Sequence, residues 1–379
     1  MAKKTYNWKD EWEHFKYDLP HQQLPFSKKN WGNANHSLCS YQGKLKPAIA
    51  HFLTETFVPE NGIMFDPFAG VGTIPFEAAL NGKTSFGMDI SIMAYYISNA
   101  KIGLTNIDLS NDYINQIKSY IDNNIVSNQY YNQYADFGLN KKLKEYYEIN
   151  TFNEILLARQ YITKNPPQTP SEMVVVSALL HILHGNRPYA LSRNSHPITP
   201  YAPTGDFIYK NLIEKLTEKV NRFYSQTSSE NFKAGEVFLQ DCTNIWPERI
   251  ENLDAIITSP PFFDSTRFYN ANWIRLWFCG WEPNDFKIKP KDYVDERQKE
   301  TFDVYENIFI QAKERLKTNG VLVFHLGKSK KCDMGNELKK MSSKWFTHSE
   351  LFDESVAHCA SFGIKDIGTV TDHQYLILY

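Results

Sequence analysis

The sequence has little excess charge of either sign. Its 379 residues carry 41 lysines and arginines against 43 aspartates and glutamates, which gives a formal net charge of -2. A strongly basic chain would by itself indicate a nucleic-acid partner, and this composition does not. Any surface that binds a polyanion must therefore be a local patch, offset by acidic residues elsewhere.

Cysteine and long apolar runs are also scarce. The five cysteines (Cys39, Cys242, Cys279, Cys332 and Cys359) form no CxxC pair, which argues against a zinc site and a disulfide framework. No cluster has metal-ligand spacing, so no metal is expected. The longest apolar stretch, near Met173 to Leu183, is too short to span a bilayer, and the first residues lack the apolar core of a signal peptide. We therefore expect a reduced, cytoplasmic protein without a membrane partner.

Strand and helix patterns alternate in two blocks of the sequence. A short apolar strand at Gly62–Asp66 leads through a glycine-bearing turn into helical spacing, and a second strand and helix follow at Thr84–Asp89 and from about Ile92 to Ile102. This unit is typical of the opening of a doubly wound α/β sheet. Strand patterns return at Glu236–Asp241, Leu253–Thr258, Gly320–His325 and Tyr375–Tyr379. The sequence thus predicts a mostly parallel, Rossmann-like α/β sheet.

Between the two blocks the sheet pattern stops. Helical stretches separated by polar loops predict a helical insertion at residues 108–234, and the proline-rich segment from Asn165 to Pro170 reads as a linker inside it. Residues 36–107 and 235–379 are then the two parts of the sheet domain. Residues 1–35, interrupted by Pro20, Pro25 and Gly32, are expected to form an arm over the main body.

The first chemical signal is the turn from Pro67 to Thr73. Glycine after a strand lets the backbone approach a nucleotide-like ligand closely, although a tight turn that packs a helix on a strand uses the same residues. The dinucleotide fingerprint needs a third glycine where this chain has Pro75. Asp89 ends the next strand, where an acid can accept hydrogen bonds from both ribose hydroxyls. A ribose acid without a phosphate cradle favours a nucleoside ligand that carries no phosphate, as S-adenosylmethionine does.

The segment from Asp66 to Thr73, DPFAGVGT, resembles the first motif of the amino-group DNA methyltransferases. Asp89 matches the ribose-binding acid of that family, and Asp241 resembles the position that meets the edge of the adenine ring. The segment from Ser40 to Pro47 looks like the motif that touches the methionine end of the cofactor. The resemblance implies a S-adenosylmethionine-dependent methyltransferase sheet and the following cofactor-binding residues: Tyr41, Lys44, Asp66, Phe68, Ala69, Gly70, Gly72, Thr73, Asp89, Ile90, Asp241 and Cys242.

A second motif, Thr258-Ser259-Pro260-Pro261-Phe262, follows a buried strand and resembles the catalytic motif of the same family in its cytosine-N4 form. An amino nitrogen conjugated with a base ring is a poor nucleophile, because its lone pair is delocalised. Hydrogen bonds accepted by the Ser259 hydroxyl and the Pro260 carbonyl would favour a pyramidal nitrogen. The two prolines fix the backbone and offer no competing N–H. Phe262 would give the target base a stacking face.

Two further sequence patterns bear on alternative methylation reactions. Asn165-Pro166-Pro167-Gln168 superficially resembles the adenine-type motif NPPY, but it follows a helix and lacks the aromatic residue. Cytosine C5 methylation needs a cysteine nucleophile after a proline, and none of the five cysteines follows a proline. The sequence therefore favours methylation of an amino nitrogen over methylation of carbon.

The region that reads the target is expected in the insertion. The loop from Arg187 to Pro197 offers Arg187, Arg193 and His196 for phosphate and base contacts, although a polar surface loop has the same composition. Arg267 follows the catalytic motif closely. The lysines at 287, 289 and 291 are expected in solvent, with phosphate contact as the alternative.

The sequence leaves three alternatives to a cytosine-N4 DNA methyltransferase. One is adenine-N6 specificity. Another is an RNA methyltransferase, because the segment from Asp66 to Ala79 also looks like tRNA guanine-N2 enzymes. The third is a catalytically silent DNA-binding relative, against which the intact Asp66, Asp89 and Ser259 argue. The preferred reading implies DNA as the partner and a restriction-modification setting in which no restriction partner is identified.

Overall fold

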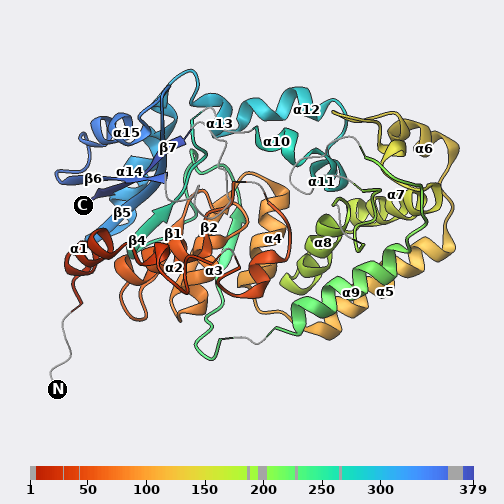
Figure 1. The fold of residues 1–379 in the computed structure, drawn as a ribbon, viewed down its shortest axis with the longest axis horizontal. Coiled ribbons are helices and arrows are strands. Elements are labelled where there is room, and N and C mark those ends of the chain that lie inside the picture. The colour runs from red at the N-terminus through yellow and green to blue at the C-terminus, as the bar shows by residue number, and fades with distance from the viewer. Residues whose placement is uncertain are drawn as a thin grey trace.

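A seven-stranded sheet runs through the left half of the molecule in Figure 1. The structure is a computed structural model that describes residues 6–28, 30–41, 43–185, 188–194, 203–226, 229–263, 267–356 and 370–379. The strand order is β3-β2-β1-β4-β5-β7-β6. The strands are β1 (Ile63–Asp66), β2 (Thr84–Asp89), β3 (Glu236–Leu239), β4 (Leu253–Thr258), β5 (Leu316–Ser329), β6 (Ser349–Ser355) and β7 (Val370–Leu378).

The pairing of the strands confirms the predicted Rossmann-like α/β class. β3, β2, β1, β4 and β5 are parallel neighbours, whereas β7 pairs antiparallel with both β5 and β6. The strand order reverses between β1 and β4, where parallel sheets of this kind bind ligands beyond the carboxyl ends of the strands. The register pairs Met64 with Ala255 and Phe65 with Ile256, so these two strand ends lie side by side.

Helices cover both faces of the sheet. On one face α1 (Trp8–Asp18), α2 (Pro47–Phe57) and α3 (Thr73–Leu80) bury Trp12, Leu53 and Ile74 against strand residues such as Val323. On the other face lie α14 (Glu306–Arg315) and α15 (Met334–Ser342). Burial on both faces explains why the central strands read as continuous apolar runs.

A separate group of helices fills the right half of Figure 1. It contains α5 (Ile107–Asn123), α6 (Asn128–Ala135), α7 (Ile149–Lys164), α8 (Pro170–Ile182) and α9 (Leu212–Tyr224), with the 3-10 turn η3 (Leu143–Glu145). The apolar core of this group is continuous with α4 (Ile92–Ile102), which packs against α8, and with α11 (Trp273–Phe278). Helical elements thus occupy the described part of the region expected as an insertion, and α11 joins them from the segment that follows β4.

Several elements were not expected from the sequence. Within residues 1–35 an α-helix, α1, begins after Asn7, whose side chain caps it, and buries Trp12 and Phe15 beside Tyr375. β6 is a polar edge strand, so its residues lack the alternation of a half-buried strand. The remaining short elements are η1 (Pro20–Gln22), η2 (Ala34–Ser37), α10 (Phe268–Ala271), α12 (Asp285–Ile288), η4 (Lys289–Asp292), α13 (Val294–Arg297) and η5 (Phe302–Tyr305).

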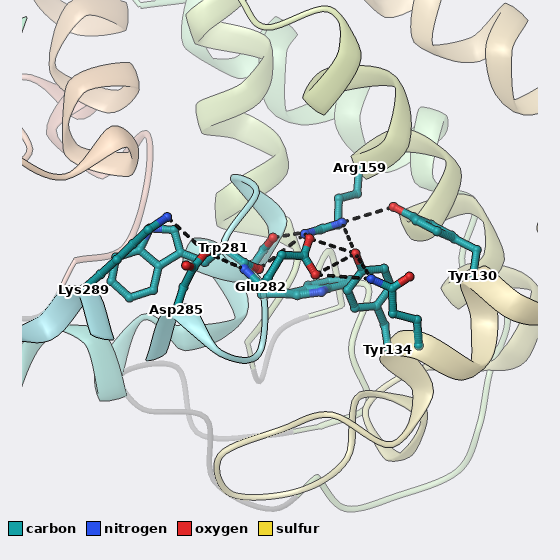
Figure 2. Close-up of polar contacts among 9 residues, drawn as sticks. Tyr130, Tyr134, Arg159, Trp281, Glu282, Asp285 and Lys289 are labelled. Carbon is teal, nitrogen blue, oxygen red and sulfur yellow. Dashed lines mark hydrogen bonds and ion pairs between the residues drawn. The ribbon is translucent and has the colours of Figure 1, made fainter. Parts of the chain in front are cut away.

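The buried guanidinium of Arg159 joins the helical group to α11 and to the segment that follows it. Figure 2 shows Arg159 of α7 reaching toward Tyr130 and Tyr134 of α6 and toward Glu282. Its Nε donates to the carbonyl of Trp277 at 2.8 Å, and its Nη2 donates to Glu282 Oε1 at 2.8 Å. The side chain of Arg159 is 3% exposed, whereas that of Glu282 is 44% exposed. Arg159 therefore satisfies several buried acceptors at once, and its partner carboxylate stays partly hydrated.

This asymmetry predicts unequal effects on stability. We expect Arg159→Met to lower the free energy of unfolding by about 2–4 kcal/mol, because buried acceptors lose their donor. Glu282→Gln should lower it by about 1 kcal/mol or less, as for a partly exposed ion pair. Lys289→Met, which removes an exposed partner of Asp285, is the control and should change it by less than about 0.5 kcal/mol. Urea denaturation measures all three, and equal losses for Arg159→Met and Lys289→Met would contradict the assignment.

Candidate active site

The carboxyl ends of the parallel strands meet at a cavity of about 770 Å³. The turn that contains Gly70 and the loop from Ser259 to Phe262 both line this cavity. Asp89 at the end of β2 and Asp241 just beyond β3 also reach it. Its volume lies in the range of small-molecule sites in proteins. The sheet therefore brings together two motifs that lie almost two hundred residues apart in the sequence.

Asp66 joins the two motifs directly. Its Oδ1 accepts a hydrogen bond from the Thr258 hydroxyl at 2.6 Å and another from the Phe68 backbone N–H at 3.0 Å. The residue is 1% exposed. Burial raises the pKa of Asp66 to about 7, and the charge of Asp89 adds to this effect, while the two hydrogen bonds oppose it. Asp66 thus ties the end of β1 to the end of β4 and holds the start of the glycine turn.

The two glycines of the turn have different roles. Both have positive φ, 52° at Gly70 and 68° at Gly72, which favours glycine. A Cβ on Gly70 would meet nothing closer than the Tyr41 hydroxyl at 3.9 Å, so this glycine faces open cavity. A Cβ on Gly72 would lie 2.8 Å from the Cβ of Ser98, so Gly72 allows α3 to pack closely on α4. Gly72 was expected to bind the cofactor, but it does not line the cavity.

Asp89 holds the glycine turn from the neighbouring strand. Its Oδ2 accepts the Gly70 N–H at 2.9 Å and its Oδ1 accepts the Ser91 N–H at 2.8 Å. Burial raises the pKa of Asp89 to about 6, although both backbone hydrogen bonds stabilise the ionised form. A carboxylate has about four acceptor positions, so two remain for a ligand in the cavity. The geometry is compatible with a pair of donors such as the hydroxyls of a ribose.

Asp241 lies at the next strand end and is itself well anchored. Its Oδ1 accepts from the backbone N–H and the hydroxyl of Thr243, at 2.9 and 2.8 Å, and its Oδ2 pairs with Arg297 Nη1 at 3.2 Å. The adjacent Cys242 is buried and also lines the cavity. Arg297 belongs to α13, so this helix helps to fix the strand end next to the one that carries Asp89.

The segment before α2 forms another wall of the cavity. Tyr41 lines it beside Gly70, and its ring lies 5.2 Å from the ring of Phe268. Lys44 also lines the cavity, but its Nζ donates to the carbonyl oxygen of His36 at 2.9 Å. The other expected cofactor-binding residues on the cavity wall are Asp66, Phe68, Ala69, Thr73 and Ile90.

The loop after β4 presents its side chains to the same cavity. The Ser259 hydroxyl lies 3.1 Å from His325 Nδ1. The carbonyl of Pro261 accepts a hydrogen bond from Gln298 Nε2 at 3.0 Å, and Gln298 in turn accepts from the Tyr305 hydroxyl at 2.9 Å. Phe262 and the buried Pro260 also line the cavity. The loop is therefore held from β5 on one side and from the end of α13 on the other.

Sequence reasoning missed several residues that line the cavity. Tyr293 lies between η4 and α13, Asp295 belongs to α13, and Phe268 stacks on Tyr293 with ring centroids 5.9 Å apart. His325 of β5 and His373 of β7 line the cavity beside the ring of Phe262. Short helices and a strand that returns from the end of the chain carry no local motif. Only the position of His325 at the end of a buried strand could have indicated it.

Four residues were predicted to bind the substrate, and none lines the cavity among the described residues. Arg193 donates from Nε to the carbonyl of Gly205 at 2.8 Å and stacks over Phe207, so its guanidinium holds its own loop. Arg267 is exposed at the start of α10, with Nη1 3.3 Å from the Tyr269 hydroxyl. Arg187 and His196 lie outside the described residues.

The described residues hold neither a metal-ligand cluster nor a membrane-spanning helix. No group of three or more His, Cys, Asp and Glu side chains there could hold a metal ion. No helix in the described ranges combines the length and the apolar character that a membrane crossing needs.

The buried carboxyl of Asp66 predicts a pH-dependent effect on stability. Because its folded pKa of about 7 exceeds its ordinary value of 3.8, the wild-type protein loses stability as pH rises from about 4 to 7. Asp66→Asn keeps an oxygen acceptor and stays neutral. We expect the variant to match the wild type near pH 4 and to exceed its free energy of unfolding by roughly 2–4 kcal/mol at pH 8. Denaturation between pH 4 and 8 measures this, and a gap that shrinks with rising pH would refute it.

Comparisons with known proteins add little to this geometry. No family model matches the chain, and no curated protein does. A TehB-like SAM-dependent methyltransferase from Corynebacterium glutamicum aligns at 7% identity and a TM-score of 0.33, over 87% of this chain and 85% of that one. An rRNA methylase from Streptococcus thermophilus aligns at 8% and 0.32, over 88% and 97%. The rRNA methyltransferase aviRa from Streptomyces viridochromogenes aligns at 9% and 0.33, over 90% and 88%. Likenesses this weak say nothing about what this chain binds.

Proposed function

We propose that this chain is an S-adenosylmethionine-dependent methyltransferase that modifies an exocyclic amino nitrogen of a nucleobase, namely N4 of cytosine in DNA. The observation that carries the proposal is the single cavity lined by both motifs. A methyl donor held at the Gly70 turn and an amino group held at Ser259 would face each other there. The hydrogen bond between Asp66 and Thr258 keeps the two loops in this relation.

The residues at the glycine turn fit the proposed cofactor. Gly70 leaves its side of the cavity open, and the carboxylate of Asp89 has free acceptor positions for the ribose hydroxyls. The carboxylate of Asp241 would accept from the adenine amino group, because its Oδ2 carries only the contact with Arg297 among its described polar contacts. When bound, S-adenosylmethionine supplies an electrophilic methyl group on a positively charged sulfur. Direct transfer of that methyl group needs no metal.

The loop after β4 would prepare the nucleophile. The Ser259 hydroxyl and the Pro260 carbonyl would accept the hydrogens of the amino group and so localise the nitrogen lone pair toward the cofactor. A base inside a duplex cannot reach the cavity, so the target must leave the stack, at a cost of about a few kcal/mol. Stacking on Phe262 would return about 1–3 kcal/mol. The SPPF sequence supports cytosine N4 as the target, because that form of the motif resembles the N4 enzymes.

The ribose role of Asp89 predicts a pH-dependent affinity. Because hydroxyl donors need the ionised carboxylate and the pKa of Asp89 is about 6 in the free protein, the dissociation constant for S-adenosylmethionine should be constant above pH 7. Below pH 6 it should rise about tenfold per unit. Asp89→Ala should bind at least about tenfold more weakly at pH 8, in line with the loss of hydrogen bonds to a charged group. Isothermal titration calorimetry measures both quantities, and unchanged affinity in Asp89→Ala would refute the ribose role.

The proposed reaction predicts a defined product. Incubation with labelled S-adenosylmethionine and unmethylated duplex DNA, followed by digestion to nucleosides, should yield N4-methylcytosine. A parallel incubation with tRNA should stay unlabelled; label in tRNA alone, or in N6-methyladenine, would overturn the substrate assignment.

Variants of the catalytic loop separate chemistry from binding. Ser259→Ala should slow single-turnover methyl transfer by roughly 10²–10³-fold, the typical loss when one preorganised hydrogen-bonding group is removed. Its affinity for S-adenosylmethionine should stay within about twofold of the wild type. Ser343→Ala, which changes an exposed serine just beyond α15, is the matched control and should leave the rate unchanged. A similar loss of cofactor affinity and rate in Ser259→Ala would place Ser259 in cofactor binding.

A further inference from the structure

One face of β5 supports the catalytic loop at two points. At the first point, Nδ1 of His325 lies 3.1 Å from the Ser259 hydroxyl oxygen. At the second, two residues along the strand, a Cβ on Gly327 would lie 2.5 Å from Cδ2 of Phe262, so the missing side chain makes room for the phenyl ring. Successive side chains alternate between the faces of a strand, so residues 325 and 327 share a face. Ser259 and Phe262 are thus both in contact with the same surface.

The burial of His325 is not explained by a full set of hydrogen bonds. It is 2% exposed, and its Nε2 has no hydrogen-bond partner among the described residues. A buried polar atom without a partner is uncommon and calls for an explanation, of which a role in the chemistry of a site is one. The imidazole also lines the cavity. Its hydrogen bond to Ser259 is its one described polar contact there.

Two aromatic rings pack against His325. The rings of His373 and Tyr375 meet the imidazole at 69° and 65°, with centroids 4.8 and 5.3 Å away. The Ser259 hydroxyl lies 3.1 Å from Nδ1, and a hydroxyl can donate to the unprotonated nitrogen of a neutral imidazole. When the imidazole carries its hydrogen on Nε2, Nδ1 is that acceptor.

We propose that His325 is a positioning residue for Ser259. Its Nδ1 accepts a hydrogen bond from the serine hydroxyl, and this turns both lone pairs of the serine oxygen toward the amino group of the substrate. The inference rests on the proposed function. Without this acceptor the hydroxyl can rotate its hydrogen toward the substrate amino group, which has no need of a donor. Gly327 acts on the same loop, because the absence of a side chain at this position leaves room for the ring of Phe262.

The groups that face His325 keep it neutral. Burial lowers its pKa well below the ordinary value, and the neighbouring His373 lowers it further. Glu354 of β6 acts in the opposite direction, but its carboxylate is already engaged by His21 at 2.8 Å and by the Tyr375 hydroxyl at 2.7 Å. A neutral imidazole can accept the serine hydrogen throughout the physiological pH range.

Three variants at His325 and Ser259 test the proposal in the full-length protein by single-turnover methyl transfer to unmethylated duplex DNA. His325→Leu should slow transfer by roughly 10²-fold while leaving the dissociation constant for S-adenosylmethionine within about twofold, because only the serine loses its acceptor. His325→Asn offers an oxygen at the place of Nδ1 and should recover the rate to within about tenfold of the wild type. In a Ser259→Ala background, His325→Leu should cost less than about threefold more.

The control is Val323→Ala on the same strand and the same face. Val323 is buried and does not line the cavity, so this variant should lower the melting temperature without slowing transfer by the folded enzyme. A rate within threefold of the wild type in His325→Leu would overturn the proposal. So would a full His325→Leu effect in the Ser259→Ala background, because His325 would then act independently of the serine.

A readout without activity separates this inference from the proposed function. In protein with ¹⁵N-labelled histidine, NMR should show His325 with hydrogen on Nε2 and an Nδ1 resonance typical of an acceptor, and Ser259→Ala should shift that Nδ1 resonance. Hydrogen on Nδ1 would overturn the positioning role even in an active enzyme. Absence of any methylated base from DNA and from RNA, with the expected NMR spectrum, would refute the proposed function and leave the hydrogen bond intact.

Discussion

The hydrogen bond between the Thr258 hydroxyl and the Asp66 carboxyl is the constraint on which the rest of the site depends. It joins the carboxyl ends of β1 and β4 at the place where the strand order reverses. At such a point the loops that follow two adjacent strands diverge to opposite faces of the sheet and leave a crevice between them. Because both partners are buried, the bond also fixes the distance across that crevice. The glycine turn and the SPPF loop then begin from a common anchor.

The contacts that hold this site use two carboxyl groups, those of Asp66 and Asp89, in poorly hydrated surroundings. Burial raises the pKa values of Asp66 and Asp89, because the ionised carboxylates lose hydration that the neutral acids need less. A protein selected for stability alone would do better with an amide at position 66. Perturbed carboxyl groups that converge on a cavity are typical of functional sites, and their retention here agrees with a site built to bind a ligand at the expense of stability.

The walls of the site come from parts of the chain that serve other structural purposes. α13 holds Asp241 through Arg297, and the residue after this helix, Gln298, holds the carbonyl of Pro261. β5 is a central strand of the sheet, yet its face positions both Ser259 and Phe262. The helical group is tied through Arg159 to the segment that leads from α11 toward this wall. The glycine turn and the SPPF loop are therefore each held by contacts from more than one element, as a preorganised site requires.

Much of the fold was predictable from local pattern. The apolar strands β1, β2 and β4 appear in the sequence close to their observed bounds, because strands buried on both faces leave continuous apolar runs. The polar edge strand β6 and the short helices α12 and α13 were not predictable, since their stability comes from packing and not from their own residues. The sequence likewise indicated the glycine turn, Asp89 and the SPPF loop as parts of one site, and all three contribute to the lining of the cavity.

Only the tertiary structure decided which residues share the cavity. It separated Gly70, which faces the open space, from Gly72, which allows two helices to pack. It placed Arg193 in contact with its own loop, outside the cavity. It also brought His325 to Ser259 across a pair of adjacent strands. Residue type and spacing determine local backbone geometry, whereas contacts between distant segments depend on strand order and register, which no single stretch of sequence encodes.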